Sequence, residues 1–388
     1  MKKRKKFSIA LLPGDGIGPE VLAEARKVLD QIACRFALQL DYRPAWIGGA
    51  AIERTGCPLP AATWEICRSA DAVLLGAVGG PQWDHLEPDR RPELGGLLAL
   101  RRRLGLYANL RPVRFYPELR EASPLTWRET TAATDLLVVR ELSSGIYFGQ
   151  PHGLTEDEAF DTMRYRRSEI ERIAHSAFQA ASSRRRQVTS VDKANVLATS
   201  MLWRRIVTEV ATGYPEIVLR HMYVDNAAMQ LVLAPSQFDV ILTENLFGDI
   251  LSDESAALAG SLGLLPSASF GAAVHLYEPA GGSAPDIAGR QIANPLAQIL
   301  SAALLLEHSL FQPEAAAAIR LAVSRAIAAG YRTADIAPPG TPAVSTAVMG
   351  DAVVAALAIP DETPPGIVLL PGPGVNERGP ATSGPGVT

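Results

Sequence analysis

Short continuous apolar runs alternate along the chain with stretches in which apolar residues recur every three or four positions. The runs have the length and composition of strands buried on both faces. They are SIALL (8–12), AVLLGAV (72–78), DLLVVRE (135–141), VTSVD (188–192) and VILTEN (240–245). In the stretch 166–186, Ile170, Ile173, Ala174 and Ala177 fall on one helical face, and 19–33 also has a helical pattern. This alternation predicts an α/β fold.

Composition narrows the class of protein. With 388 residues, 47% of them apolar, the chain can bury a large core in one elaborate domain or two. The net charge of -4 argues against a nucleic-acid or membrane-surface partner, and no run approaches the ~20 apolar residues that span a bilayer. Cys34, Cys57 and Cys67 lack metal-ligand spacing, so we expect reduced thiols and a cytoplasmic protein.

The two ends of the chain have unusual composition. Lys2 to Lys6 read KKRKK, which we expect to be a solvated tail, and the following FSIALL is too short and lacks the cleavage site of a signal peptide. Residues 361–388 are dense in proline and glycine and are predicted to be a disordered tail.

Glycines in LLPGDGIGPEV follow a strand and precede a helix. Gly14, Gly16 and Gly18 alternate, however, which is not the spacing of the dinucleotide fingerprint. A turn that admits a ligand and a purely structural turn both remain open.

Asp249 and Asp253 stand four residues apart in ENLFGDILSDE, so a helix places both on one face. Two such carboxylates repel each other unless a cation or arginines lie between them, and their oxygens suit Mg²⁺ or Mn²⁺. Asp225, which follows another strand-like run, could supply a third carboxylate. A helix cap or a surface charge is the simpler interpretation of each aspartate alone.

Three arginines occur within apolar or glycine-rich stretches of the sequence: Arg101 in LLALRRRL, Arg111 in ANLRPV and Arg140 directly after LLVV. The carboxyl end of a buried strand is where α/β proteins bind ligands, and the guanidinium fork matches a carboxylate. A structural ion pair is the alternative for each.

Lys193 is the sole lysine after Lys27, in a chain where lysine makes up six of the 37 basic residues. Arginine can replace lysine as a solvated charge, but only lysine can release a proton near neutral pH. Composition alone leaves chance survival equally open.

LPGDGIGPEV is followed in order by PELGGLLALR, ANLRP, VRELSSGIYFGQP, TSVDKANVL, YVDNAAMQL, NLFGDILSDE and LYEPAGGSAPDIAGRQIANP. From about Phe7 to Leu357 this series resembles the isocitrate/isopropylmalate dehydrogenase family, and within it the branch that oxidises 3-isopropylmalate. Ser143 and Ser144 depart from the family's glycine-rich pattern, which we expect to alter only a loop.

The resemblance implies a homodimer with shared active sites. Asp249 and Asp253 of one subunit and Asp225 of the other would hold Mg²⁺ or Mn²⁺ and the substrate. Lys193, also from the partner subunit, would assist removal of the hydroxyl proton, and Tyr147 would assist protonation of the enolate carbon.

The implied reaction is the NAD-dependent oxidative decarboxylation of (2R,3S)-3-isopropylmalate to 4-methyl-2-oxopentanoate, in leucine biosynthesis. Arg101, Arg111 and Arg140 would bind its carboxylates, and Leu97 and Leu98 would form an apolar wall for the isopropyl group. The alternative is a sister enzyme acting on tartrate or homoisocitrate. An inactive regulatory relative is disfavoured because every one of these groups is present.

For the cofactor, the resemblance implies binding of NAD by two segments, with Asp286 accepting hydrogen bonds from the adenosine ribose and repelling a 2′-phosphate. The implied contacts are Gly80, Glu93, Glu278, Gly282, Ser283, Ala284, Pro285, Asp286, Ile287 and Asn294.

The implied architecture is the two-domain α/β fold of isopropylmalate and isocitrate dehydrogenases, and not a standard Rossmann fold. Residues 1–106 and 261–360 would form the cofactor-side domain. Residues 107–260 would carry the metal ligands and the dimer contacts.

Overall fold

The computed structural model describes residues 5–125 and 134–360. The predicted disordered tail, 361–388, lies outside the described residues. The first strand begins at Lys5, so Lys5 and Lys6 belong to a strand and not to the solvated tail expected there. Both remain exposed, and Lys6 Nζ lies 3.7 Å from a carboxylate oxygen of Asp41.

Ten strands of the described chain form one sheet in the order β2-β1-β3-β12-β11-β4-β5-β10-β8-β9, and β6 and β7 form a separate hairpin. The strands are β1 (Lys5–Gly14), β2 (Leu38–Pro44), β3 (Ala72–Ala77), β4 (Ala108–Arg114), β5 (Asp135–Glu141), β6 (Gly153–Leu154), β7 (Ala159–Phe160), β8 (Gln187–Asp192), β9 (Val218–Tyr223), β10 (Val240–Thr243), β11 (Pro266–Phe270) and β12 (His275–Pro279). The pairs β12–β11, β11–β4 and β4–β5 are antiparallel and the others parallel. An antiparallel centre flanked by parallel strands is not the Rossmann arrangement, as predicted.

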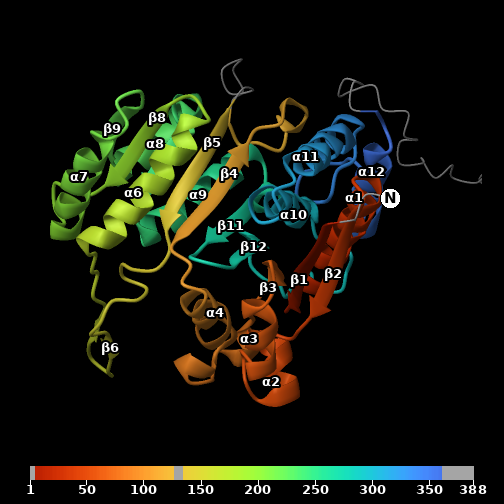
Figure 1. The fold of residues 1–388 in the computed structure, drawn as a ribbon, viewed down its shortest axis with the longest axis horizontal. Coiled ribbons are helices and arrows are strands. Elements are labelled where there is room, and N and C mark those ends of the chain that lie inside the picture. The colour runs from red at the N-terminus through yellow and green to blue at the C-terminus, as the bar shows by residue number, and fades with distance from the viewer. Residues whose placement is uncertain (1–4, 126–133, 361–388) are drawn as a thin grey trace, which may run out of the picture.

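Helices cover both faces of this sheet (Figure 1). They are α1 (Gly18–Arg35), α2 (Gly49–Thr55), α3 (Ala61–Arg68), α4 (Ala99–Arg103), α6 (Arg167–Ser182), α7 (Ala198–Ala211), α8 (Val224–Leu233), α9 (Asn245–Ala259), α10 (Leu296–His308), α11 (Pro313–Ala328) and α12 (Thr346–Leu357). A π-helical segment, Pro92–Leu98, leads into α4. None of the helices described is both long and apolar enough to cross a membrane.

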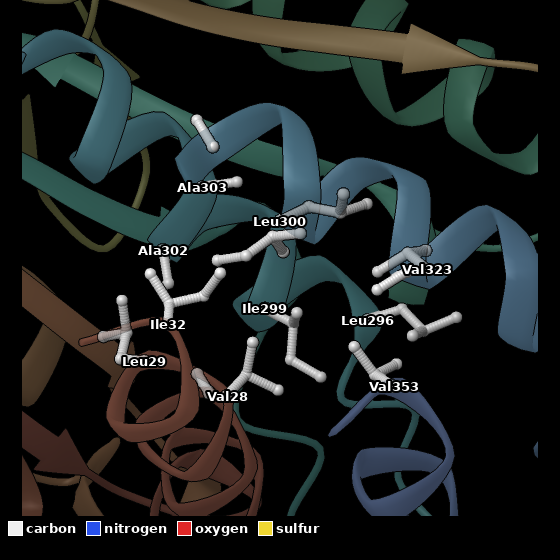
Figure 2. Packing of buried hydrophobic residues seen from close by; sticks show 14 of the residues in the cluster. Val28, Leu29, Ile32, Leu296, Ile299, Leu300, Ala302, Ala303, Val323 and Val353 are labelled. Carbon is white, nitrogen blue, oxygen red and sulfur yellow. The ribbon is translucent and has the colours of Figure 1, made fainter. Parts of the chain in front are cut away.

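The first half of the sheet is covered on both faces. Successive side chains of a strand point in opposite directions, so each strand contributes to two layers of the core. In β1, Ile9 and Leu11 pack with α1, α10, α11 and α12, whereas Ala10 and Leu12 pack on the other side with residues of α3 and α4. Figure 2 shows the first of these layers, in which Val28, Leu29 and Ile32 of α1 face Ile299 and Ala302 of α10.

The second half repeats this arrangement. Leu137 and Val139 of β5 pack with α6 and α7, and Leu136 and Val138 pack with α8 and α9. Every run predicted as a strand from its continuous apolar residues is a strand, which confirms the α/β prediction. The predicted helix 166–186 ends earlier, at Ser182, and Arg186 has a positive φ of 58°.

Residues 1–106 and 261–360 supply the five neighbouring strands β2, β1, β3, β12 and β11 of the sheet. Residues 107–260 supply the other five, β4, β5, β10, β8 and β9. Tyr116 and Leu119 nevertheless pack into the core beside α1 and α10. The division into two domains at these boundaries stays a prediction.

Candidate active site

Arg101, Arg111 and Arg140 line one cavity of about 380 Å³, although they come from α4, β4 and β5. Asp249, Asn245 and Tyr147 line it as well. Arg111 and Arg140 project from the antiparallel pair β4–β5 beside the amino end of α9. With Arg101 they bring three cationic groups and the carboxylate of Asp249 into a small space. The cavity can therefore bind an anion with more than one carboxylate.

Arg140 is held almost entirely inside the protein, with 2% of its side chain exposed. Its Nε and Nη2 donate to Asn245 Oδ1 at 3.0 and 2.8 Å, and its Nη1 donates to Asp249 Oδ1 at 2.5 Å. Burial, together with the charge of Arg111, lowers the pKa of Arg140 to about 10. Asn245 therefore fixes one edge of the guanidinium, and the other edge is directed toward Asp249 and the cavity.

Arg111 bridges the two aspartates of α9. Its Nη2 lies 3.2 Å from Asp249 Oδ1 and its Nη1 donates to Asp253 Oδ1 at 2.9 Å. Burial raises the pKa of Asp249, but Arg140 and Arg111 outweigh it, and the pKa lies below its usual range. For Asp253, burial and the charge of Asp249 prevail over Arg111, and the pKa is raised.

The spacing prediction for this pair is confirmed in its geometry, since both carboxylates share one face and one arginine. Their oxygens are the donor type that Mg²⁺ or Mn²⁺ prefers, so the donor set fits such an ion. Within the described residues of one chain, no three carboxylate, histidine or cysteine groups gather to hold a metal. One chain thus presents two ligands of the implied three.

Tyr147 follows β5 and is 41% exposed. Its hydroxyl donates to Asp249 Oδ2 at 2.9 Å, and its ring lies against the guanidinium of Arg140, with 5.7 Å between the ring centroid and Cζ. Burial and the neighbouring Asp249 raise the pKa of Tyr147 to about 12. The phenol therefore carries its proton at neutral pH and can donate it.

Arg101 reaches the cavity from α4 and pairs with Glu278 of β12 at 2.5 Å. Its Nε is buried without a hydrogen-bond partner. Glu278, which the resemblance assigned to the cofactor, thus contacts a predicted substrate residue directly. The pair joins the two predicted binding regions.

The apolar wall of the cavity consists of Leu94, Leu98, Leu142 and Phe148. Leu97, predicted for this wall, packs instead against the core beside α3 and α4. The prediction assumed α-helical spacing back from Arg101, but residues Pro92–Leu98 form a π-helical segment, in which Leu94 and Leu98 line the cavity.

Lys193 and Asp225 do not line this cavity. Lys193 Nζ donates to Asp225 Oδ1 at 2.6 Å, and this hydrogen bond lowers the pKa of Asp225, which lies at the surface in the first turn of α8. The two residues predicted to act from the partner subunit are therefore brought together with each other and kept apart from Arg140.

The alternating glycines serve close backbone packing. At Gly14, with φ +68°, a Cβ would lie 1.8 Å from the carbonyl oxygen of Ala77, and at Gly16 it would lie 1.9 Å from that of Ser283. Ile17 N donates to the same Ser283 oxygen at 2.8 Å. Asp15 between them accepts from the backbone N–H groups of Gly49, Ala50 and Gly79. The turn docks the predicted cofactor loop.

A second cavity, of about 330 Å³, opens beside this turn. Among the predicted cofactor residues, Gly282, Ala284, Ile287 and Asn294 line it. Pro285 and Asp286 are exposed, and Ser283 is buried against Ile17. The Glu93 side chain packs closely on Gly79, because a Cβ added at Gly79 would lie 2.1 Å from Glu93 Oε1. The predicted contact Gly80 is the next residue along the chain. An apolar slot beside a glycine-rich loop fits the adenosine half of a dinucleotide.

The sequence profile of the isocitrate/isopropylmalate dehydrogenase family matches residues 8–353. The chain belongs to this family. A 3-isopropylmalate dehydrogenase of Thermotoga maritima is 60% identical over 347 residues, covering 89% of this chain and 98% of that protein. The enzyme of the same name from Escherichia coli K12 is 57% identical over 354 residues, covering 90% and 97%.

Solved structures of the isocitrate/isopropylmalate dehydrogenase family share the fold. An isocitrate dehydrogenase from Methylococcus capsulatus aligns with a TM-score of 0.80 at 36% identity, covering 90% of this chain and 99% of that one. A β-decarboxylating dehydrogenase from Thermococcus kodakarensis aligns with a TM-score of 0.74 at 36% identity, covering 91% and 96%. The predicted fold class is confirmed.

The sequence predictions missed the residues that hold the predicted ones in place. Asn245 fixes Arg140, and Asn109 likewise accepts from Arg111 Nε at 2.9 Å. Tyr165 donates to Glu244 Oε2 at 2.9 Å and accepts from Asn245 N at 3.0 Å. Asn109 lies two residues before Arg111, and Asn245 begins NLFGDILSDE. Nothing in the sequence alone links either asparagine to an arginine.

Proposed function

We propose that this protein catalyses the NAD-dependent oxidative decarboxylation of (2R,3S)-3-isopropylmalate to 4-methyl-2-oxopentanoate, a step of leucine biosynthesis. The observation that carries the proposal is a cavity in which three arginines face Leu94, Leu98 and Leu142. Arginines suit two carboxylates and leucines suit a branched alkyl group. The 57–60% identity to enzymes named 3-isopropylmalate dehydrogenase favours this substrate over tartrate or homoisocitrate.

In this proposal Arg101, Arg111 and Arg140 bind the two carboxylates and orient C2 of the substrate toward the nicotinamide. When bound, Mg²⁺ or Mn²⁺ would polarise the hydroxyl oxygen and NAD⁺ would accept the hydride. Asp249 and Asp253, with Asp225 from a second copy, would be the metal ligands; Asp225 also lies near the substrate in this arrangement.

Lys193 would remove the hydroxyl proton, for which it must be neutral. The C2 hydrogen leaves with its electron pair, and the carboxylate β to the new carbonyl then departs as CO₂. Tyr147 would give its proton to the resulting enolate carbon, a role that its position at the cavity supports, since its hydroxyl lies 2.9 Å from Asp249 Oδ2 and its ring lies against Arg140.

We place NAD across the loop Gly282 to Asn294 and the segment Gly80 to Glu93. The second cavity supports the adenosine position, and the exposed Asp286 at its loop would accept from the ribose hydroxyls and repel a 2′-phosphate. Glu278 would lie between the cofactor and Arg101.

A homodimer with shared sites completes the proposal. Lys193 and Asp225 lie outside the cavity of their own chain, and α8 and α9 expose Met229, Leu233 and Ile250, the last with 57% of its surface free. Exposed apolar side chains on two neighbouring helices support an association surface there. We further propose a cytoplasmic location, which the free cysteines Cys34, Cys57 and Cys67 support.

The test is a steady-state comparison of 3-isopropylmalate, malate, tartrate, isocitrate and homoisocitrate, with NAD⁺ and with NADP⁺, and with and without Mg²⁺ or Mn²⁺. We expect the highest kcat/KM for 3-isopropylmalate with NAD⁺ and a divalent ion. A higher kcat/KM for any other diacid would contradict the substrate, and a preference for NADP⁺ would contradict the placement of Asp286.

A further inference from the structure

Arg204 of α7 ties together the ends of two neighbouring strands. Its Nε and Nη2 donate to Asp192 Oδ2 and Oδ1 at 2.9 and 2.8 Å, the bidentate geometry in which a guanidinium matches a carboxylate. The guanidinium also lies over the ring of Tyr223, with 4.9 Å between Cζ and the ring centroid. Asp192 ends β8, Tyr223 ends β9, and the two residues lie opposite each other in this parallel pair. One arginine therefore contacts the carboxyl ends of both strands.

The two residues predicted to act on a second subunit follow these strand ends. Lys193 comes directly after Asp192. Asp225 comes two residues after Tyr223, in the first turn of α8. Lys193 Nζ donates to Asp225 Oδ1 at 2.6 Å, but the Asp225 side chain is 66% exposed, and an ion pair at the surface has little strength of its own. The backbone at the two strand ends, which Arg204 holds together, therefore sets the spacing of the pair.

The carboxylate of Asp192 also shapes the turn that carries Lys193. Asp192 Oδ1 accepts from Ala194 N at 2.9 Å, and the carbonyl oxygen of Lys193 accepts from Leu197 N at 3.0 Å. Only 1% of the Asp192 side chain is exposed, and a carboxylate buried to this degree is costly without a cation beside it. The turn thus depends on the guanidinium of Arg204.

We propose that Arg204 is a positioning residue, which holds Lys193 and Asp225 at the spacing in which they act on the active site of a second subunit. This inference rests on the proposed function and its shared sites, and it adds a residue that touches neither substrate nor cofactor. The alternative is an ion pair that stabilises the fold alone. The two differ in one respect, because a positioning Arg204 serves the site of the other subunit and not the cavity of its own chain.

The first measurement is the steady-state kinetics of Arg204→Lys, which keeps a positive charge beside Asp192 but loses the planar fork. We expect kcat to fall by about 10²-fold, the usual effect of displacing a reacting group by about 1 Å, with KM for 3-isopropylmalate within about twofold of wild type. Asp192→Asn removes the buried charge itself and should give the same result, which keeps the test open where Arg204→Lys does not fold. The matched control is Arg205→Lys, at the exposed next position of α7, which should keep both constants.

Subunit mixing shows which site Arg204 serves. Arg204→Lys exchanged with Arg140→Ala should recover about a quarter of wild-type activity, because half of the dimers then contain one intact site of two. Arg204→Lys exchanged with Lys193→Ala should recover nothing beyond the activity of Arg204→Lys alone, because the lysine is then missing or displaced at every site. A variant that only weakened its own subunit would not distinguish these two partners.

The outcomes separate this inference from the function on which it rests. Equal recovery with Arg140→Ala and with Lys193→Ala, or no recovery with either, would overturn the positioning role of Arg204 and leave the dehydrogenase proposal standing. A mixture of Arg140→Ala with Lys193→Ala that stays inactive would overturn the shared site and this inference together. A wild-type protein that does not oxidise 3-isopropylmalate would overturn the proposed function itself.

Discussion

Asn245 Oδ1 accepts two hydrogen bonds from Arg140, one from Nε and one from Nη2. Asn245 is itself fixed, because its Nδ2 donates to the carbonyl oxygen of Ser144 at 3.0 Å and its backbone N–H donates to Tyr165. One edge of the guanidinium is thereby occupied by the protein, and the remaining Nη1 is directed at Asp249 and the cavity.

Replacing Asn245 by alanine should therefore loosen Arg140 without removing its charge. We expect KM for the diacid to rise about tenfold, with a smaller change in kcat, and the free energy of unfolding to fall by about 1–3 kcal/mol because two buried N–H groups lose their acceptor. The control is Ser255→Ala on the same helix, whose hydroxyl donates to Leu251 O at 2.6 Å. It should affect stability alone; an unchanged KM in Asn245→Ala would contradict the positioning role.

Mixing two inactive variants tests the shared active site. Lys193→Ala and Arg140→Ala should each abolish turnover, but a heterodimer would contain one site with both residues intact. Random reassortment of equal amounts should restore about a quarter of wild-type activity, since half of the dimers carry one working site of two. Activity that stays absent after subunit exchange, with dimers verified by light scattering, would place Lys193 and Arg140 in separate functions.

Leu98 should select the substrate side chain. Leu98→Asn is expected to raise KM for 3-isopropylmalate far more than KM for malate, because losing an apolar contact to a branched group costs about 1–3 kcal/mol. Leu97→Asn is the matched control, since Leu97 packs against the core and not into the cavity. It should lower the melting temperature with little effect on the ratio of the two KM values. Equal increases in Leu98→Asn would refute the assignment.

Tyr147→Phe should separate oxidation from protonation. The variant keeps the ring against Arg140 and removes the hydroxyl that contacts Asp249, so substrate still binds while turnover falls by about 10²–10⁴-fold, the usual worth of a general acid. In a single turnover, NADH should appear before 4-methyl-2-oxopentanoate. If both slow by one factor and added 2-oxo intermediate is processed normally, Tyr147 positions the substrate only.

Phe270 contacts two half-buried histidines, with ring-centroid distances of 4.7 Å to His275 and 5.2 Å to His308. Burial lowers the pKa of both histidines below 6.5, so the unfolded chain binds protons there that the folded chain does not. Stability is therefore present above pH 6.5 and is lost as the pH falls from 6.5 toward the lowered pKa values.

Urea unfolding at pH 5 and pH 7.5 measures this loss. The double variant His275→Gln with His308→Gln should depend less steeply on pH than the wild-type protein, whatever its absolute stability. His152→Gln, at an exposed position, serves as the control and should keep the wild-type slope. An unaltered slope in the double variant would show that other groups govern the acid sensitivity.

Local pattern predicted the strands well because each is covered on both faces, which leaves a continuous apolar run such as DLLVVRE. It also placed Asp249 and Asp253 on one helix face, since that depends only on helical period. Local pattern could not predict the antiparallel centre of the sheet. The strands β4 and β11 pair across more than a hundred residues, and neither of their sequences, ANLRPVR and PSASF, contains an apolar run.

The site shows the same limit. Arg140 was recognisable at the end of a strand, but Asn245 and Tyr165 act through contacts that only the folded chain creates. Leu97 was assigned by α-helical spacing, but the segment before α4 is a π-helix, which sequence spacing did not predict, and Leu97 packs against the core. Residues whose chemistry depends on their own type were predictable, and residues whose chemistry depends on distant neighbours were not.

The pairing of β3 with β12 has a consequence for synthesis on the ribosome. Ala72 of β3 lies opposite His275 of β12, so the apolar strand AVLLGA emerges long before its neighbour exists. At ordinary translation rates the interval is roughly 10–40 s. The segment between them contains β4, β5, β8, β9 and β10, which pair among themselves and can fold while the nascent amino-terminal part waits. During that time the unpaired edge of β3 is open to other chains, and chaperone binding should be concentrated there.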